Sequence, residues 1–306
     1  MRLVRHISYK NFLFFSLLLL ILFSCAKVPI TGRNQLTLIP DYQLISMSEK
    51  AYRDFLEKHK QCPPNSSGSR MVQRVGTRIS RAVERFMYET GQSDRIRGFQ
   101  WEFHLVCDKK INAWCMPGGK VVVYKGILPV AKNETGLAVV LGHEIAHAIA
   151  NHASERMSQQ LLLQLGGEVL SIATGSTNPA TRRLLFQLYG LGANVGVLLP
   201  YSRIQEYEAD HLGLIFMAIA GYDPRQAIAF WERMAKAGKN KPRPPEFLST
   251  HPSDTSRIQK IRQYIPEAMR YYNRYLQEQG YSNKRNNNYY QNNYYNYHYR
   301  NYYKRY

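Results

Sequence analysis

The sequence predicts an α+β fold that is mainly helical, with a small β-sheet beside one buried helix. Three observations support this fold class. The chain has 306 residues and 44% apolar composition, enough for one sizeable core. Two short stretches, 99–107 and 120–124, have the alternating or β-branched character of strands. Most of the remaining central sequence spaces its apolar residues as a helix does.

The first half of the chain divides at its prolines and glycines. Residues 26–42 contain two prolines and a glycine, so an extended N-terminal segment is expected there. Apolar residues in 43–60 and 70–90 recur with helical spacing. The strand at 99–107 is separated from the one at 120–124 by a Pro-Gly-Gly turn, and the two strands form the expected sheet.

The second half is predicted to be helical. Asn133 is a good N-cap, and a helix should run from it to about Gln160. Residues 166–200 are rich in Gly, Ala, Ser and Leu, which fits either a buried helical hairpin or a mobile lid with glycine hinges. Further helices are expected at 203–220, after Asp223-Pro224, and over 255–279.

The two ends differ from the globular middle. Residues 1–24 combine positive charge, a short apolar run and a small residue, as a secretory signal does; an uncleaved membrane anchor is the alternative. The sequence before Cys25 resembles a bacterial lipobox, so we expect lipid on Cys25. This predicts a lipoprotein of the bacterial cell envelope, facing the periplasm and attached to the outer membrane. Residues 26–279 would form the folded domain, and the Asn/Tyr-rich basic tail 280–306 should be disordered.

Charge and cysteine content restrict the partners. The formal charge of +19 favours anionic lipid headgroups or acidic polymers, and no nucleic-acid-binding motif is present, so nucleic acid is not expected. With Cys25 lipidated, three cysteines remain, an odd number that cannot all pair internally. Cys107 could bridge to Cys115, which would leave Cys62 unpaired. We expect no catalytic role for any of them.

The chemistry is concentrated in a His-Glu-x-x-His motif, where x is any residue. His143 and His147 are one helical turn apart and point the same way, so both can hold one zinc ion per chain. Glu144 is offset by about 100° and can reach a water on the metal, taking its proton as general base. The alternative, two surface histidines beside a solvated glutamate, conflicts with the apolar residues all round this helix, which predict burial.

A second acidic motif supplies the missing ligand. Glu206 and Asp210 lie four residues apart on one predicted helical face. Glu206 can complete the catalytic set of three protein ligands, and Asp210 can fix the tautomer of a ligand histidine. Glu208 lies on the other side and fits a solvated acidic face. His152 is about 140° from His147 on a continuous helix, so we expect it to cap or pack rather than ligate.

These residues resemble the CAAX-prenyl-protease and HtpX-type family of zinc metallopeptidases, which are gluzincins with a zincin-like domain. The resemblance is closest to an envelope branch with Oma-like lipoproteins and outer-membrane assembly proteases. Four ordered motifs over roughly 28–275 carry it. They are Pro29-Ile30-Thr31-Gly32-Arg33, Asn112-Ala113 with Pro117-Gly118-Gly119, the His143 and Glu206 motifs together, and Thr250-His251-Pro252 with Arg257.

The resemblance implies further roles. It implies a zinc metalloendopeptidase with Glu206, not Glu208, as third ligand. It places His251 and Arg257 near the oxyanion of the tetrahedral intermediate, where a donor stabilises developing charge. In some relatives the corresponding histidine occupies the open metal position and keeps the enzyme latent. The alternative for His251 is a simple turn before Pro252.

Substrate binding is assigned to the strand 120–124. If this strand is exposed at a sheet edge, an unfolded chain can pair with its backbone, with Gly119, Val121 and Val123 in contact and Asn112 adding a hydrogen bond. The expected partners are therefore unfolded or misassembled envelope proteins, with the membrane reached through the lipid anchor. Two other functions compete: a chaperone-like assembly factor whose peptidase site is shut, and a structural lipoprotein with stabilising zinc.

Overall fold

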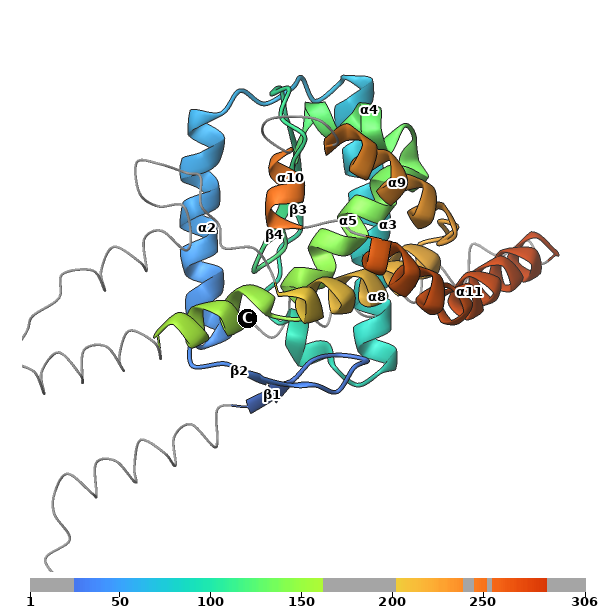
Figure 1. The fold of residues 1–306 in the computed structure, drawn as a ribbon, viewed down its shortest axis with the longest axis horizontal. Helices are drawn as coiled ribbons and strands as arrows, with labels where there is room; N and C mark the ends of the chain where they lie inside the picture. Colours follow the sequence, from blue (N-terminus) through green and yellow to red (C-terminus); the bar gives the residue numbers. More distant parts are fainter. Residues whose placement is uncertain (1–24, 162–201, 239–244, 252–254, 285–306) are drawn as a thin grey trace, which may run out of the picture.

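A computed structural model of the chain describes residues 25–161, 202–238, 245–251 and 255–284. The predicted signal segment, the 166–200 segment and most of the tail lie outside these residues. Helices predominate and two small sheets accompany them (Figure 1), which confirms the mainly helical α+β class. The helices are α2 (Asp41–Lys58), α3 (Ser67–Glu89), α4 (Leu128–Ala131), α5 (Glu134–Ile149), α8 (Arg203–Ile219), α9 (Gln226–Gly238), α10 (Glu246–Thr250) and α11 (Thr255–Lys284).

The sheets are small and differ in connectivity. Strands β1 (Cys25–Lys27) and β2 (Asn34–Leu36) form an antiparallel pair in the segment expected to be extended. The larger sheet has the order β3 (Glu102–Val106), β5 (Lys120–Tyr124), β4 (Ala113–Met116), with β5 parallel to β3 and antiparallel to β4. Helix α2 covers one side of this sheet, and α3 and α5 lie on the other (Figure 1).

The larger sheet corrects one prediction. The strand at 120–124 exists, but it is the central strand, paired on both sides and buried along its whole length. The prediction that it forms an exposed edge is therefore wrong, and substrate pairing there through Gly119, Val121 and Val123 loses its physical basis. The β-branched run is typical of a strand buried on both faces. The two edge strands are β3, whose end pairs with residues 60–62, and β4, for which no strand was predicted.

Helix α5 forms the centre of the core. Its predicted N-cap is confirmed, since the Asn133 side chain accepts a hydrogen bond from the Gly136 backbone N–H. It crosses α8 where two glycines meet: a Cβ on Gly142 would lie 2.8 Å from the Gly213 carbonyl oxygen. Only glycine permits this approach. The crossing brings the two motifs that carry the metal-binding residues face to face.

The end of α5 differs from the prediction. The helix stops at Ile149 rather than about Gln160, and Asn151 has the left-handed φ of 52° that asparagine tolerates at a helix end. The Ala150 N–H still bonds to Ala146, after which residues 152–161 form a separate helical stretch. The chain therefore changes direction just before His152.

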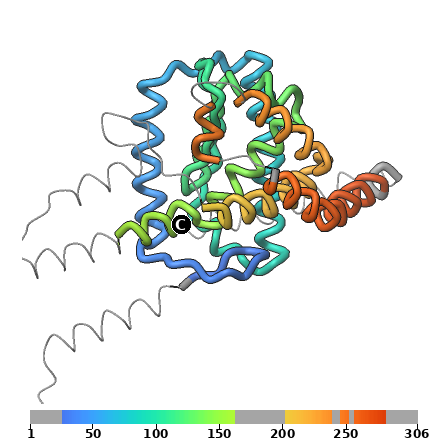
Figure 2. The backbone as a smooth tube through the Cα atoms, in the orientation of Figure 1, coloured from blue at the N-terminus to red at the C-terminus, as the bar shows by residue number. Residues whose placement is uncertain are grey.

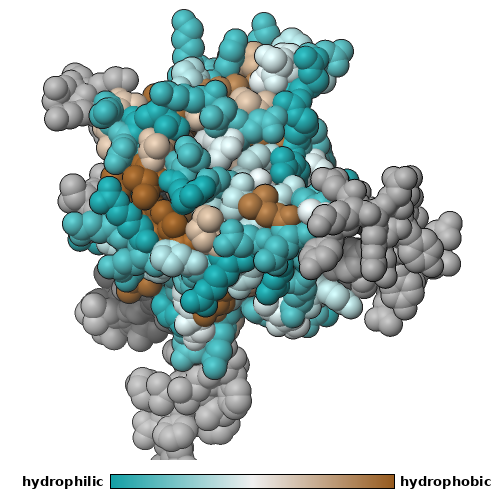
Figure 3. Space-filling view, turned by 90° about the vertical axis from the view of Figure 1, so that its right-hand side faces the viewer, coloured by the Kyte–Doolittle hydropathy of each residue, from teal (hydrophilic) through white to brown (hydrophobic). Residues whose placement is uncertain are grey.

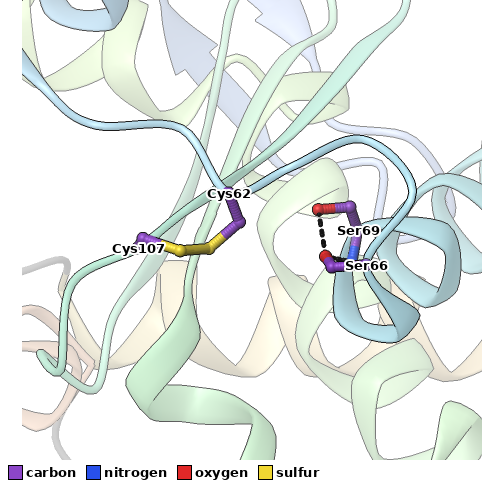
Figure 4. Close-up of a disulfide and its surroundings, with 4 residues drawn as sticks. All are labelled: Cys62, Ser66, Ser69 and Cys107. Carbon is purple, nitrogen blue, oxygen red and sulfur yellow. Dashed lines mark hydrogen bonds between the residues drawn. A yellow bond between two sulfur atoms is a disulfide. The ribbon is translucent and has the colours of Figure 1, made fainter.

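The disulfide also differs from the predicted possibility. Cys62 pairs with Cys107, with their Cα atoms 5.0 Å apart (Figure 4). Cys115 keeps a free thiol. The chain before α3 runs beside the end of β3, where the Cys62 N–H donates to Leu105 and the Cys107 N–H to Lys60. A Cys107–Cys115 bridge is therefore wrong.

Figure 3 shows one face of the surface, on which hydrophilic residues dominate and apolar residues gather in a few patches. Among the described residues, no helix combines the length and apolar character needed to cross a membrane.

Candidate metal centre

Two residues of α5 begin the site. His143 and His147 are buried, and their Nε2 atoms lie 3.1 Å apart, as expected for side chains one turn apart on one face. Glu144 is buried beside them. Its Oε1 accepts no hydrogen bond within the described part of the chain.

Helix α8 faces this pair with its carboxylates. Ser202 and Gln205 cap the helix start reciprocally and fix where its first turn lies. Glu206 then lies 3.4 Å through Oε1 from His147 Nε2 and 3.5 Å through Oε2 from His143 Nε2. Asp210, one turn later, lies 3.0 Å through Oδ1 from His143 Nδ1. The structure thus brings together the residues that the spacing predicted.

His251 follows α10 and enters the same site. It is buried, and its Nδ1 lies 2.9 Å from Glu206 Oε1 and 3.2 Å from His143 Nε2. Its Nε2 lies 3.4 Å from Glu144 Oε1. His143, His147, Glu206 and His251 together offer four potential ligand atoms within 4.8 Å of one another.

This donor set fits a metal ion. Two nitrogen ligands at about 2.0–2.1 Å from a tetrahedral zinc lie roughly 3.3 Å apart, close to the 3.1–3.5 Å between the His143, His147 and Glu206 atoms. Imidazole with carboxylate suits zinc among the common divalent ions. The buried Glu144 Oε1 without a hydrogen bond points to a further polar group that belongs in the site.

The pKa shifts of the buried groups also favour a metal site. Burial lowers the pKa of His147 well below its ordinary value, which keeps the ring neutral as a metal ligand must be. Burial raises the pKa of Glu144 to about 7, and the charge of Glu206 adds to the effect. Burial would also raise the pKa of Glu206, but the nearby His251 and Arg257 outweigh it and hold this pKa well below its usual range.

Arg257 lies against the carboxylates. Its Nε donates to Asp210 Oδ2 at 2.7 Å, and its Nη1 lies 2.8 Å from Glu206 Oε2. The guanidinium covers the ring of Trp231, with 3.5 Å between its central carbon and the ring centroid. These contacts favour holding the ligand carboxylates in place. A role for Arg257 at an oxyanion stays a prediction.

Two residues near His147, His152 and Glu208, contact each other on the side away from Glu206. His152 Nδ1 lies 2.9 Å from His147 Nδ1, and its Nε2 lies 3.1 Å from Glu208 Oε2. Glu208 is 5% exposed, so the predicted solvated face is wrong. Burial opposes ionisation, but hydrogen bonds from His152, Arg33 and Thr31 lower the pKa of Glu208 to about 2. The helical-wheel angle for His152 assumed a continuous helix, whereas Asn151 could have signalled the break.

The predicted substrate residues are divided. Val121 and Val123 are fully buried in β5. Asn112 is also buried, just before the edge strand β4, and its Oδ1 accepts a hydrogen bond from the Ala113 N–H. Of these residues, Asn112 alone remains next to an edge that a substrate could reach.

Comparison with known proteins agrees with this site. The model of peptidase family M48 matches residues 74–265. The mitochondrial metalloendopeptidase OMA1 of Schizosaccharomyces pombe is 36% identical over 79% of this chain and 66% of its own length. OMA1 of Saccharomyces cerevisiae is 32% identical over 80% of this chain and 70% of its own. The chain spans 46% of bovine OMA1.

The comparison overturns the predicted location. The eukaryotic relatives above are mitochondrial enzymes that match about four fifths of the chain. The β-barrel assembly-enhancing protease of Yersinia pestis is 32% identical over only 53% of it. The prediction of a bacterial outer-membrane lipoprotein is therefore wrong. It relied on a short apolar run before a cysteine, which is weak evidence for a lipobox. The predicted lipid anchor at Cys25 and the predicted envelope substrates both depended on that location.

Proposed function

The chain belongs to peptidase family M48, and we propose that it is a zinc-dependent endopeptidase in which His143, His147 and Glu206 hold the metal and Glu144 is the general base. One observation carries the proposal: the ligand atoms of these three residues converge beside a buried carboxylate oxygen that accepts no hydrogen bond from the described residues. The finer resemblance to CAAX-prenyl-protease and HtpX-type enzymes is also a proposal, and the OMA1 relatives favour its Oma-like group.

The chemistry follows from the positions of the side chains. Bound zinc would supply a Lewis acid that lowers the pKa of water towards neutrality. Glu144 Oε1 takes the proton of the attacking water and delivers it to the leaving amine. In the metal-free site, burial raises the pKa of Glu144 to about 7, so this carboxylate is more basic than an exposed one. Asp210 holds His143 through Nδ1, which would leave Nε2 available to bind the metal.

The substrate is proposed to be an unfolded or misassembled protein, which makes the enzyme a quality-control protease. The edge strand β4 supports this proposal. The Tyr124 N–H donates to the Asn112 carbonyl, so in the antiparallel alternation the backbone groups of Ala113 and Cys115 face away from β5. An extended substrate could pair with them whatever its side chains. The Ala113 N–H donates at present to Asn112 Oδ1. In the proposed complex a carbonyl oxygen of the substrate would replace this side-chain oxygen as acceptor.

A second candidate is favoured by the position of His251. Its Nδ1 lies among the ligand atoms as a fourth donor, and a catalytic zinc site needs that position open. A chaperone-like factor with a shut peptidase site would have this arrangement. We favour an endopeptidase held latent by His251, because a binding protein has no need for Glu144.

The test is cleavage of casein by the purified full chain, with zinc content measured beside it. Glu144→Gln should retain zinc and lose about 10²–10⁴-fold in kcat/KM, the contribution of a general base. Equal cleavage by wild type and Glu144→Gln would remove the proposed base. Absence of cleavage in both, with zinc bound, would favour the shut site.

A further inference from the structure

A chain of hydrogen bonds leads away from His147 on the side opposite the metal centre. His147 Nδ1 lies 2.9 Å from Nδ1 of His152, and His152 Nε2 lies 3.1 Å from Glu208 Oε2. His152 has no exposed surface, and Glu208 has almost none. Buried polar groups that meet at such distances hold each other in fixed orientations.

The chain of contacts ends in the N-terminal segment. Arg33 donates from Nε to Glu208 Oε1 at 2.9 Å and from Nη2 to Oε2 at 2.9 Å. The same guanidinium donates from Nη1 to Glu155 Oε1 at 2.6 Å and from Nη2 to Oε2 at 2.8 Å. Thr31 Oγ1 adds a hydrogen bond to Glu208 at 2.8 Å. Figure 2 shows this segment, in blue, running beneath the ends of the helices that carry the metal-binding residues.

The contacts assign the protons. A carboxylate only accepts, so His152 Nε2 carries a proton and donates it to Glu208. In a neutral ring, Nδ1 of His152 then accepts, and it can do so only from a proton on His147 Nδ1. That tautomer leaves the lone pair of His147 on Nε2, the atom that faces Glu206.

We propose that His152, Glu208 and Arg33 are positioning residues of the metal centre, which hold the His147 ring in the orientation and tautomer that bind zinc. The proposal rests on the proposed zinc site. It makes the N-terminal segment part of that site, although Arg33 lies outside the residues matched by the family model. The two ligand histidines then have different supporting partners: Asp210 contacts His143, and His152 contacts His147.

The test measures zinc affinity of the full chain by competition with a chelating dye, with the fold of each metal-free variant checked by circular dichroism. His152→Leu removes both hydrogen bonds and should weaken zinc binding about 10–100-fold, the usual effect of losing an outer partner. His152→Gln offers one acceptor and one donor and should restore most of the affinity. A residue that only fills space would show the opposite order, because leucine fills the buried site without polar atoms.

Arg33 has a matched control. Arg33→Met should weaken zinc binding in the same direction. Arg85 also joins distant segments through two hydrogen bonds to one glutamate, Glu278, and its side chain is similarly exposed, 33% against 27% for Arg33. Arg85→Met should leave zinc affinity unchanged.

The outcomes separate this inference from the proposed function. A wild type that binds no zinc would overturn both. Tight wild-type binding with unchanged affinity in Arg33→Met and His152→Leu would overturn the positioning role alone. So would a His152→Gln variant that folds but binds as weakly as His152→Leu. If His152→Leu fails to fold, Arg33→Met decides the question, since the Arg33 side chain is partly exposed whereas His152 is fully buried.

Discussion

At the scale of single residues, His251 has two incompatible neighbours. Through Nδ1 it contacts Glu206 at 2.9 Å, and through Nε2 it lies 3.4 Å from the Glu144 oxygen that should accept a proton. In the proposed mechanism a water would lie beside Glu144 Oε1, next to this ring. We therefore expect His251 to move when Glu144 acts as base.

Removing the His251 side chain should change the rate of casein cleavage in opposite directions for its two proposed roles. If His251 keeps the site shut, His251→Ala should raise casein cleavage several-fold while three ligands still hold zinc. If it stabilises an oxyanion instead, the same variant should lose about 10²–10³-fold in kcat. Adding Glu144→Gln to His251→Ala should abolish any gain, which controls for a contaminating protease. A loss of activity with zinc retained would contradict the latent state.

Local geometry explains which site residues the sequence could predict. His143 with His147 and Glu206 with Asp210 are one-turn pairs on single helices, so their spacing determines that they share a face. His152 could not be placed in this way, because the left-handed Asn151 turns the chain immediately before it. Glu208 was misjudged because its partner Arg33 is distant in sequence and local spacing carries no sign of it.

At the scale of elements, the long periodic helices were predictable and the strand pairing was not. Helices α3 and α8 begin and end close to their predicted bounds because their apolar periodicity and capping residues are local signals. Strand β4 has four residues and only partly buried side chains after Ala113, so no clear pattern marks it. Because β5 pairs with β3 on one side and β4 on the other, β5 is central and the other two strands are edges, an arrangement that no strand reveals alone.

The Cys62–Cys107 disulfide is predicted to stabilise the junction between α3 and the sheet. It closes a loop over a sequence separation of 45 residues, so replacing both cysteines by serine should lower the free energy of unfolding by about 2–4 kcal/mol. Denaturant unfolding under non-reducing conditions measures this difference. Cys115→Ser is the control, because its thiol is free and it should cost far less. Equal losses in the two variants would argue that the disulfide adds nothing beyond burial.

At the scale of the whole molecule, the proposed metal would join parts of the chain that are far apart in sequence. Its ligands come from α5, from α8 and from the residue that follows α10, and Arg257 of α11 holds one of them. Without a metal ion, three carboxylates and three imidazoles remain buried at one place, with Arg257 beside two of the carboxylates, and burying ionisable groups together is costly. A bound ion would therefore stabilise the fold as well as serve the reaction.

Metal removal should consequently lower the melting temperature of the whole domain. At a free zinc concentration about 1,000 times the Kd, binding adds about 4 kcal/mol to the free energy of unfolding. Each kcal/mol corresponds to about 2–4 °C in melting temperature, so chelation should lower the melting temperature by about 8–16 °C. Differential scanning calorimetry with and without a chelator measures this shift, and adding zinc back should restore the transition.

Two variants serve as controls. His147→Ala should melt at the same temperature with and without the chelator, because the site has lost a ligand. Glu144→Gln should keep the full shift, because the base is not a ligand. The contrary outcome is a wild-type melting temperature that the chelator does not change, although metal analysis shows that zinc has left. The buried donors would then satisfy one another without a metal. The contacts of His251, Glu206 and Arg257 would form a structural network rather than a metal centre.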